Sequence, residues 1–238
     1  MSLLKSKLLN FLRRYNELGL VVIPIHPGEK RALPAKWQNL PREELFEVAM
    51  ESLSRGAEIN LGIRLDGLSV LDLERPELWS LFFPRGSPEE VSRRTWVCRT
   101  GGGGFHIYLR GETNPLRADG FAEIRSGNRQ YMVAPPSIHP ETGREYEWLG
   151  DPLEIGPAEV SEAVVQHARK IIGIFREHWP LIKSLVDAWR PEHRHNLALW
   201  FAGVCKKSGV PQREAEVVVH ACALLARDPE VEDRLRAL

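Results

Sequence analysis

The amino-acid sequence predicts an α+β protein in which helices flank a mixed or antiparallel β-sheet, followed by a small C-terminal helical bundle. Three observations support this prediction. Apolar residues recur at helical spacing before residue 55, short β-rich segments alternate with turn residues between 60 and 149, and helical spacing returns after 157. We therefore expect two domains, at residues 1–157 and 158–238.

The N-terminal segment predicts two helices around one buried strand. Apolar residues at helical spacing predict a helix over 3–18, which Gly19 ends. Leu20–Ile25 is a short apolar run that contains β-branched residues, as expected for a buried strand. A second helix is predicted over 41–54, beginning at Pro41.

The middle of the chain predicts seven strands. They are expected at residues 60–64, 68–74, 95–99, 105–110, 121–125, 131–134 and 145–149. Turn residues separate these segments, notably Asp66-Gly67, the glycines at 101–104, and Ser126-Gly127-Asn128.

The C-terminal segment predicts a helical bundle. A helix is expected over 158–178, Pro180 interrupts it, and apolar spacing continues over 181–189. Two further helices are predicted over 195–208 and 211–227.

Composition limits the class of protein. Lys+Arg and Asp+Glu both number 32, so the chain is not a histone-like coat for nucleic acid, although a local basic groove is compatible with zero net charge. The three cysteines are scattered and form no CxxC pair, which predicts buried small side chains rather than a zinc ribbon or disulfides. Neither a signal peptide nor a membrane-spanning run is visible, so we expect a cytoplasmic protein without a membrane partner.

An acidic pair on a predicted strand is the first candidate for chemistry. In Val70-Leu71-Asp72-Leu73-Glu74 the two acids lie two residues apart and therefore face the same side of the strand. Carboxylate pairs hold Mg²⁺ or Mn²⁺ beside phosphates, because these ions prefer oxygen ligands. A solvent-facing strand with alternating acids would have the same pattern.

A glycine run before a strand is the second candidate. Residues 100–109 read T-G-G-G-G-F-H-I-Y-L, in which Gly103 and Gly104 leave backbone N–H groups accessible to a phosphate. The run is not a P-loop, because it lacks the Lys-Ser/Thr pair and precedes a strand. His106 and Tyr108 share one strand face. A simple turn followed by a structural histidine is the alternative.

A third acid with a neighbouring arginine completes the candidates on the sheet. Glu123 and Arg125 share a strand face, where they form either an ion pair or a site in which the guanidinium reaches a triphosphate. Ser137 and His139 follow in the turn P-P-S-I-H, either as ligand contacts or as support for the site.

The order of these motifs resembles the primase-polymerase branch of the archaeo-eukaryotic primase superfamily, over about residues 15–150. The resemblance implies a primase-like catalytic core, in which Asp72, Glu74 and Glu123 bind two divalent ions and His106 and Arg125 contact the nucleotide's phosphates. The sequence departs from the family pattern twice. Glu123 stands where Asp is more common, and Gly104 stands where the family often has Ser.

The resemblance also implies partners and further contacts. The expected activity is DNA primase/polymerase nucleotidyl transfer with Mg²⁺ or Mn²⁺, in replication of a plasmid, virus or other mobile element. Single-stranded DNA template, primer, and dNTP or NTP are the expected partners, together with a helicase domain or protein. Candidate DNA contacts are Lys30, Lys36, Trp37, Arg194 and Asn196, which are otherwise solvated, capping or core residues. A non-catalytic nucleic-acid-binding module and a metal-dependent nuclease remain the alternatives.

Overall fold

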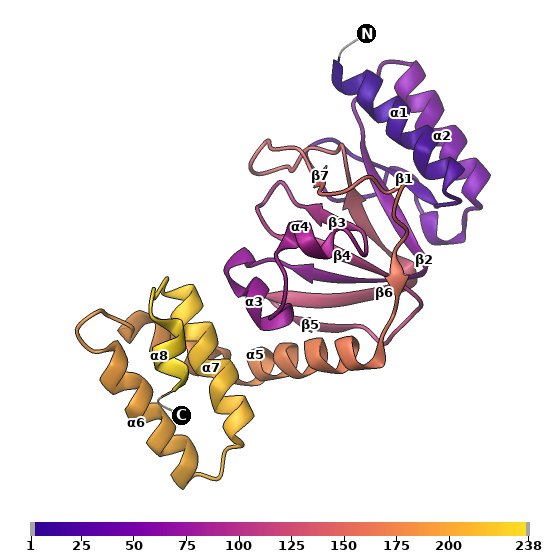
Figure 1. Cartoon of the computed structure of the whole chain (residues 1–238). Helices are drawn as coiled ribbons and strands as arrows, with labels where there is room; N and C mark the ends of the chain where they lie inside the picture. The colour runs from indigo at the N-terminus through magenta and orange to yellow at the C-terminus, as the bar shows by residue number, and fades with distance from the viewer. Residues whose placement is uncertain (1–2, 237–238) are drawn as a thin grey trace.

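A mixed sheet of eight strands organises the N-terminal part of the computed structural model, which describes residues 3–236 (Figure 1). The main path runs β5-β6-β2-β4-β3-β7, with β1 paired to β2 and β8 paired to β4. Only the pairing of β4 with β8 is parallel among these strands. The strands are β1 (Val22–Ile25), β2 (Asn60–Leu73), β3 (Val97–Arg99), β4 (Phe105–Arg110), β5 (Leu116–Ala118), β6 (Ala122–Ala134), β7 (Glu147–Trp148) and β8 (Ala158–Glu159).

Helices cover both faces of this sheet. On one side, α1 (Leu3–Glu17) and α2 (Arg42–Ser54) bury their apolar stripes in a cluster that includes Val70 and Tyr108. On the other side, α3 (Trp79–Phe82) and the first half of α5 (Glu162–Ala188) pack in a second cluster. Two shorter helical turns, η1 (Trp37–Asn39) and η2 (Pro76–Leu78), and the short helix α4 (Pro88–Val91) lie in the connections.

The alternation of side chains along β2 decides which residues reach each face. Leu71 and Leu73 belong to the cluster under α3 and α5, whereas Val70 belongs to the cluster under α1 and α2. Asp72 therefore projects on the same side as Val70, because strand residues two apart share a face. His106 and Tyr108 are the corresponding pair on β4.

Two predicted turns lie inside long strands. The sequence predicts separate strands on either side of Asp66-Gly67, but β2 continues through them with a shift in its pairing to β6 between Arg64 and Ser69. β6 likewise continues through Gly127, which adopts a positive φ of 86°. Both segments are irregularities in one long ladder, because each half of β2 pairs with the same strand β6.

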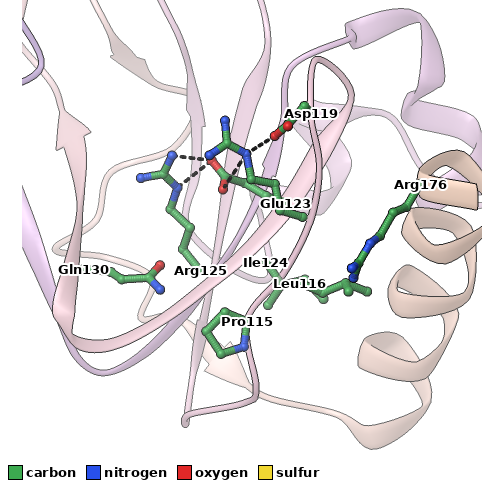
Figure 2. A pocket seen from close by; sticks show the side chains of 9 residues that line it. Pro115, Leu116, Asp119, Glu123, Ile124, Arg125, Gln130 and Arg176 are labelled. Carbon is green, nitrogen blue, oxygen red and sulfur yellow. Dashed lines mark hydrogen bonds and ion pairs between the residues drawn. The ribbon is translucent and has the colours of Figure 1, made fainter. Parts of the chain in front are cut away.

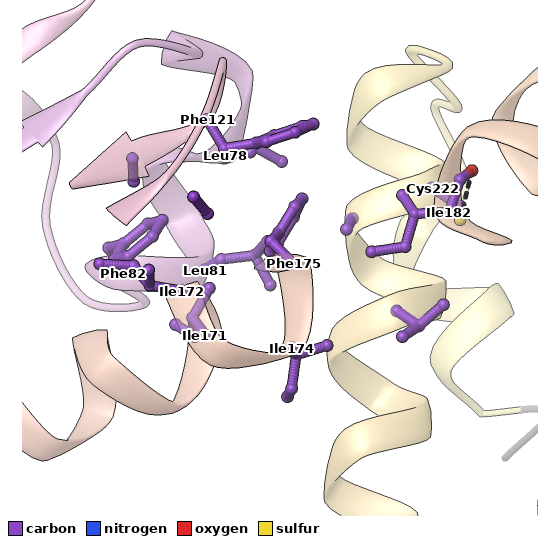
Figure 3. Packing of buried hydrophobic residues seen from close by; sticks show 14 of the residues in the cluster. Leu78, Leu81, Phe82, Phe121, Ile171, Ile172, Ile174, Phe175, Ile182 and Cys222 are labelled. Carbon is purple, nitrogen blue, oxygen red and sulfur yellow. Dashed lines mark hydrogen bonds between the residues drawn. The ribbon is translucent and has the colours of Figure 1, made fainter. Parts of the chain in front are cut away.

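The C-terminal helices extend from the sheet through α5. They are α6 (Arg194–Lys207), α7 (Gln212–Leu225) and α8 (Val231–Leu235). The expected interruption at Pro180 is wrong, because α5 is one helix with Pro180 inside it. Figure 3 shows how this helix joins the two parts: Phe175 packs near Phe121 of the sheet side, and Ile182 lies beside Cys222 of α7.

The predicted α+β fold class is confirmed by this architecture. The boundary after residue 157 stays a prediction, and β8, which pairs with the sheet, follows it directly. The three cysteines are buried and unpaired, as predicted. Within residues 3–236, no helix has both the length and the apolar character that crossing a membrane requires.

Candidate functional site

A transverse row of polar side chains crosses the face of the sheet that carries α1 and α2. Asp72 of β2 is the register partner of both His106 on β4 and Glu123 on β6. Direct partners in antiparallel strands have Cα atoms about 4.5–5.5 Å apart. The three predicted residues, distant in sequence, are therefore neighbours in space.

Asp72 is a nearly buried carboxylate with little compensation for its charge. Its side chain is only 14% exposed, and the closest basic atom is Nε2 of His106, 3.6 Å from Oδ1. The pKa of Asp72 is raised to about 7, mainly by burial and next by the negative charge of Glu123, while the positive charge of Arg125 opposes the shift. A cation beside Asp72 would relieve this desolvated charge.

His106 is buried and neutral at neutral pH. Burial lowers the pKa of its imidazole to about 3, and the positive charge of Arg125 acts in the same direction. Its Nδ1 atom is buried and has no hydrogen-bond partner within the part of the chain that the structure describes. A neutral imidazole offers one N–H donor, so His106 is able to bind a phosphate oxygen by a hydrogen bond but adds no positive charge.

Glu123 is held by arginines in this structure. Nε of Arg125 donates to Oε1 of Glu123 at 2.6 Å, and the Arg125 Nη2 atom contacts the same oxygen. Nε of Arg117, on β5, lies 4.0 Å from Oε2. Glu123 and Arg125 therefore form the ion pair that was one of the two interpretations. For Glu123 to act as a metal ligand, a metal ion would have to replace the Arg125 guanidinium at Oε1.

Glu74 lies just beyond the end of β2 and is exposed. Its backbone N–H donates to the carbonyl of Phe121 at 2.8 Å, which fixes the chain next to β6. Among residues 3–236, no group of three or more His, Cys, Asp or Glu side chains converges as a metal site. The donor chemistry of Asp72, Glu74 and Glu123 suits Mg²⁺ or Mn²⁺, but the three carboxylates are not assembled around one point.

Asp72 and His106 open into a cleft of about 230 Å³, here called the first cleft. Aromatic rings and basic side chains line it, and Trp37 packs edge-on against Tyr131 with ring centroids 4.9 Å apart. Five of the predicted site residues are among its walls, whereas Arg129, Gln130, Tyr131 and Tyr146 were not predicted as site residues. The lining residues are Lys30, Trp37, Asp72, His106, Arg125, Arg129, Gln130, Tyr131, Met132, Val133 and Tyr146.

Glu123 faces a neighbouring, larger cleft of about 570 Å³, here called the second cleft (Figure 2). It lies between β5, β6 and α5, and it shares Arg125 and Gln130 with the first cleft. The Glu123–Arg125 ion pair therefore lies at the boundary between the two clefts. The lining residues are Pro115, Leu116, Arg117, Asp119, Glu123, Ile124, Arg125, Gln130 and Arg176.

The glycine run forms a tight turn between β3 and β4. The Thr100 N–H donates to the Gly104 carbonyl, and the Gly103 N–H donates to the Thr100 carbonyl, each at 2.9 Å. A Cβ atom on Gly104 would lie 2.3 Å from the carbonyl oxygen of Leu73. Gly104 is therefore required for close packing against the end of β2, and its role as a phosphate contact, like that of Gly103, stays a prediction.

Ser137 and His139 support the site from beside it. The Ser137 hydroxyl, which is fully buried, donates to the Leu61 carbonyl at 3.0 Å and accepts from the Leu61 N–H at 2.8 Å. Nδ1 of His139 accepts from the Glu141 N–H at 3.3 Å. Neither residue lines the first or the second cleft, and their nucleotide contacts stay predictions.

The remaining predicted DNA contacts lie outside both clefts. Lys36 is exposed in the loop before η1, and Asn196 is exposed on α6. Arg194 is engaged within the C-terminal helices, where its Nη1 lies 3.1 Å from Asp228 and its Nη2 lies 2.7 Å from Glu230.

A comparison with protein-family models gives one match on the described architecture. The Prim-Pol model, described as bifunctional DNA primase/polymerase, N-terminal, matches residues 12–163. This segment is more than half of the chain and contains the whole row of Asp72, His106 and Glu123. No curated protein matches the chain.

Proposed function

Because the chain belongs to the Prim-Pol family of bifunctional DNA primase/polymerases, we propose that it joins nucleotides on a DNA template by metal-dependent nucleotidyl transfer. We propose a role in replication of a plasmid, virus or other mobile element. The observation that carries the chemical proposal is the row of Asp72, His106 and Glu123 on three adjacent strands, with Arg125 between two clefts.

The carboxylates Asp72, Glu74 and Glu123 would hold the Mg²⁺ or Mn²⁺ ions. When bound, such ions lower the pKa of the attacking 3′-hydroxyl and compensate the negative charge of the leaving pyrophosphate. Asp72 favours this role because it is a desolvated carboxylate without a full cationic partner. Glu123 offers a second carboxylate on the adjacent strand once Arg125 releases it.

The first cleft would bind the incoming nucleotide. Lys30 and Arg125 bring positive charge to it, and His106 adds a neutral N–H donor. These groups suit a triphosphate, because guanidinium and ammonium groups pair with phosphate oxygens. The rings of Trp37 and Tyr131 offer apolar surface for a base or sugar. Positioning and charge compensation would then provide most of the catalysis.

The template strand would run near this cleft. Lys36 in the neighbouring loop and Asn196 on α6 have exposed polar groups for its backbone. Arg194 is the weaker candidate, because Asp228 and Glu230 already bind its guanidinium. A helicase domain or protein is the further partner that we propose for this activity.

A single assay separates the proposed activity from its alternatives. The protein is incubated with primed or unprimed template, labelled dNTPs or NTPs, and Mg²⁺ or Mn²⁺. We expect template-dependent extension that is lost with EDTA and in Asp72→Asn. Degradation of the DNA would indicate a nuclease, and neither extension nor degradation, with DNA still bound, would indicate a non-catalytic binding module.

A further inference from the structure

The second cleft lies next to the proposed catalytic row but is distinct from the first cleft. Its volume of about 570 Å³ exceeds the 230 Å³ of the first cleft, and the two share only Arg125 and Gln130. Glu123 reaches the second cleft, whereas Asp72 reaches the first. The register pair of Asp72 and Glu123 therefore lies between two cavities of different size.

The charges that line the second cleft leave one arginine uncompensated. Arg117 pairs with Asp119, and Arg125 pairs with Glu123. Arg176 enters from α5, where it is exposed and forms no ion pair with any residue between 3 and 236. Figure 2 shows its side chain reaching toward Leu116 from the opposite wall. Among the ionised side chains that line this cleft, Arg176 thus carries a positive charge that no carboxylate of the lining balances.

The backbone that carries Arg176 is firmly anchored. The preceding residue, Phe175, is 1% exposed, and its ring lies 4.8 Å from the ring of Phe121, the residue just before β6. One turn of helix earlier, Ile172 is also buried in the same cluster. This packing fixes the origin of the Arg176 side chain relative to β6, where Glu123 and Arg125 lie.

We propose that the second cleft binds the 3′-terminal part of the growing strand, with Arg176 as a positioning residue for its phosphates. This inference rests on the proposed function, because joining nucleotides requires two substrates at the same carboxylates. The smaller first cleft suits a single nucleotide, and the larger second cleft suits a strand end. Arg117 and Arg176 line the second cleft, and their guanidinium groups can pair with the phosphates of a strand backbone.

The experiment measures strand binding and nucleotide use separately in the full chain. In Arg176→Glu, we expect the Kd for primed template to rise about tenfold. In Arg176→Ala, we expect the slope of log Kd against log salt concentration to fall by about one, which corresponds to the loss of one phosphate contact. KM for dNTP should rise by a smaller factor than the Kd for primed template, because Arg176 does not line the first cleft. Arg176→Lys should restore most of the affinity, because it keeps the positive charge.

Lys170→Glu provides the matched control. Lys170 is an exposed residue of the same helix that lines neither cleft, and the substitution makes the same change in net charge. We expect its Kd for primed template to stay within about twofold of wild type. An equal loss of affinity in both variants would show a general charge effect and overturn the proposal.

The remaining outcomes distinguish this inference from the proposed function. If wild-type protein extends primers but Arg176→Glu binds primed template normally, the strand site is wrong and the activity stands. In a second case, wild-type protein does not incorporate nucleotides, but Arg176→Glu binds primed template more weakly than wild type and binds unprimed template normally. The strand site then stands and the proposed activity is wrong. An equal loss on primed and unprimed template would overturn the assignment to the 3′ end.

Discussion

Asp72 and Glu123 are register partners on adjacent antiparallel strands, yet their carboxylates lie in different electrostatic surroundings. Arg125 binds Glu123, whereas the closest basic group to Asp72 is the neutral imidazole of His106. The charge of Asp72 is thus poorly compensated by the neighbouring side chains. This difference leads first to a prediction that does not require an activity assay.

Asp72→Asn should stabilise the metal-free protein at alkaline pH. The pKa of the Asp72 carboxyl is raised from 3.8 to about 7, first by burial and then by the charge of Glu123. Because the folded state holds the proton more tightly than the unfolded state, wild-type stability should fall as the pH rises from 3.8 to about 7. Thermal unfolding in EDTA should give the variant a Tm a few degrees higher at pH 8, with the difference disappearing toward pH 4.

Asp187→Asn is the control for that comparison, because Asp187 is an exposed carboxylate on α5. Its Tm should follow that of wild type at every pH. A lower Tm for Asp72→Asn at pH 8 would show that the carboxylate has a stabilising partner, and the proposed uncompensated charge would be wrong.

Arg125→Ala should affect the nucleotide more than the template. Arg125 borders the first cleft, so its loss should raise the KM for dNTP by about tenfold or more while the Kd for primed template changes less. The substitution also frees Glu123 from its ion pair, so Mn²⁺ should bind more tightly to the variant without nucleotide. Steady-state kinetics and a metal titration followed by calorimetry measure the two effects. The opposite order of KM and Kd changes would assign Arg125 to the DNA.

Ser137→Ala separates a structural role from a ligand contact. The buried hydroxyl makes two hydrogen bonds to the backbone of Leu61, so its removal should cost roughly 1–3 kcal/mol of unfolding free energy. Chemical denaturation measures this loss, and the KM for dNTP at a temperature where the variant is folded should be unchanged. A raised KM with unchanged stability would instead place the hydroxyl on the nucleotide.

Local patterns in the sequence predicted the central strands well, because side chains alternate between the two faces of each strand. The spacing along each strand placed His106 on one face with Tyr108 and Glu123 on one face with Arg125, since alternation along a strand depends only on neighbouring residues. The family resemblance implied that Asp72 and Glu123 meet at one site, and the pairing of β2 with both β4 and β6 is a finding of the structure. The ion pair of Glu123 with Arg125 was one of two interpretations, and only the geometry distinguishes them.

Long-range packing determined the features that the sequence did not predict. Asp66-Gly67 has the composition of a turn, but pairing with β6 on both sides keeps β2 continuous. Pro180 cannot donate a backbone hydrogen bond, but burial of Ile182 and its neighbours maintains α5 through it. The strands β5 and β8 are too short to give a periodic signal. The second cleft was missed because Arg117 and Arg176 are 59 positions apart.

Arg194 provides the last prediction, because the sequence indicates DNA binding and the structure indicates a role in packing. Its guanidinium contacts Asp228, whose fully buried carboxylate also binds Arg234 and the indole N–H of Trp189. Arg194→Ala removes one cation from this buried acid, and we expect a loss of roughly 1–3 kcal/mol in the stability of the C-terminal helices. Hydrogen exchange in α6 and α8 would detect that loss.

The neighbouring Asn196 serves as the comparison. It is exposed on α6, so Asn196→Ala should leave hydrogen exchange unchanged. For Arg194→Ala, the Kd for single-stranded template should change less than about threefold, because Asp228 and Glu230 already occupy the guanidinium. A variant that keeps normal exchange in α6 and α8 but loses template affinity would show that Arg194 leaves these acids to bind DNA. The ion pairs would then belong to the unbound state of the C-terminal helices only.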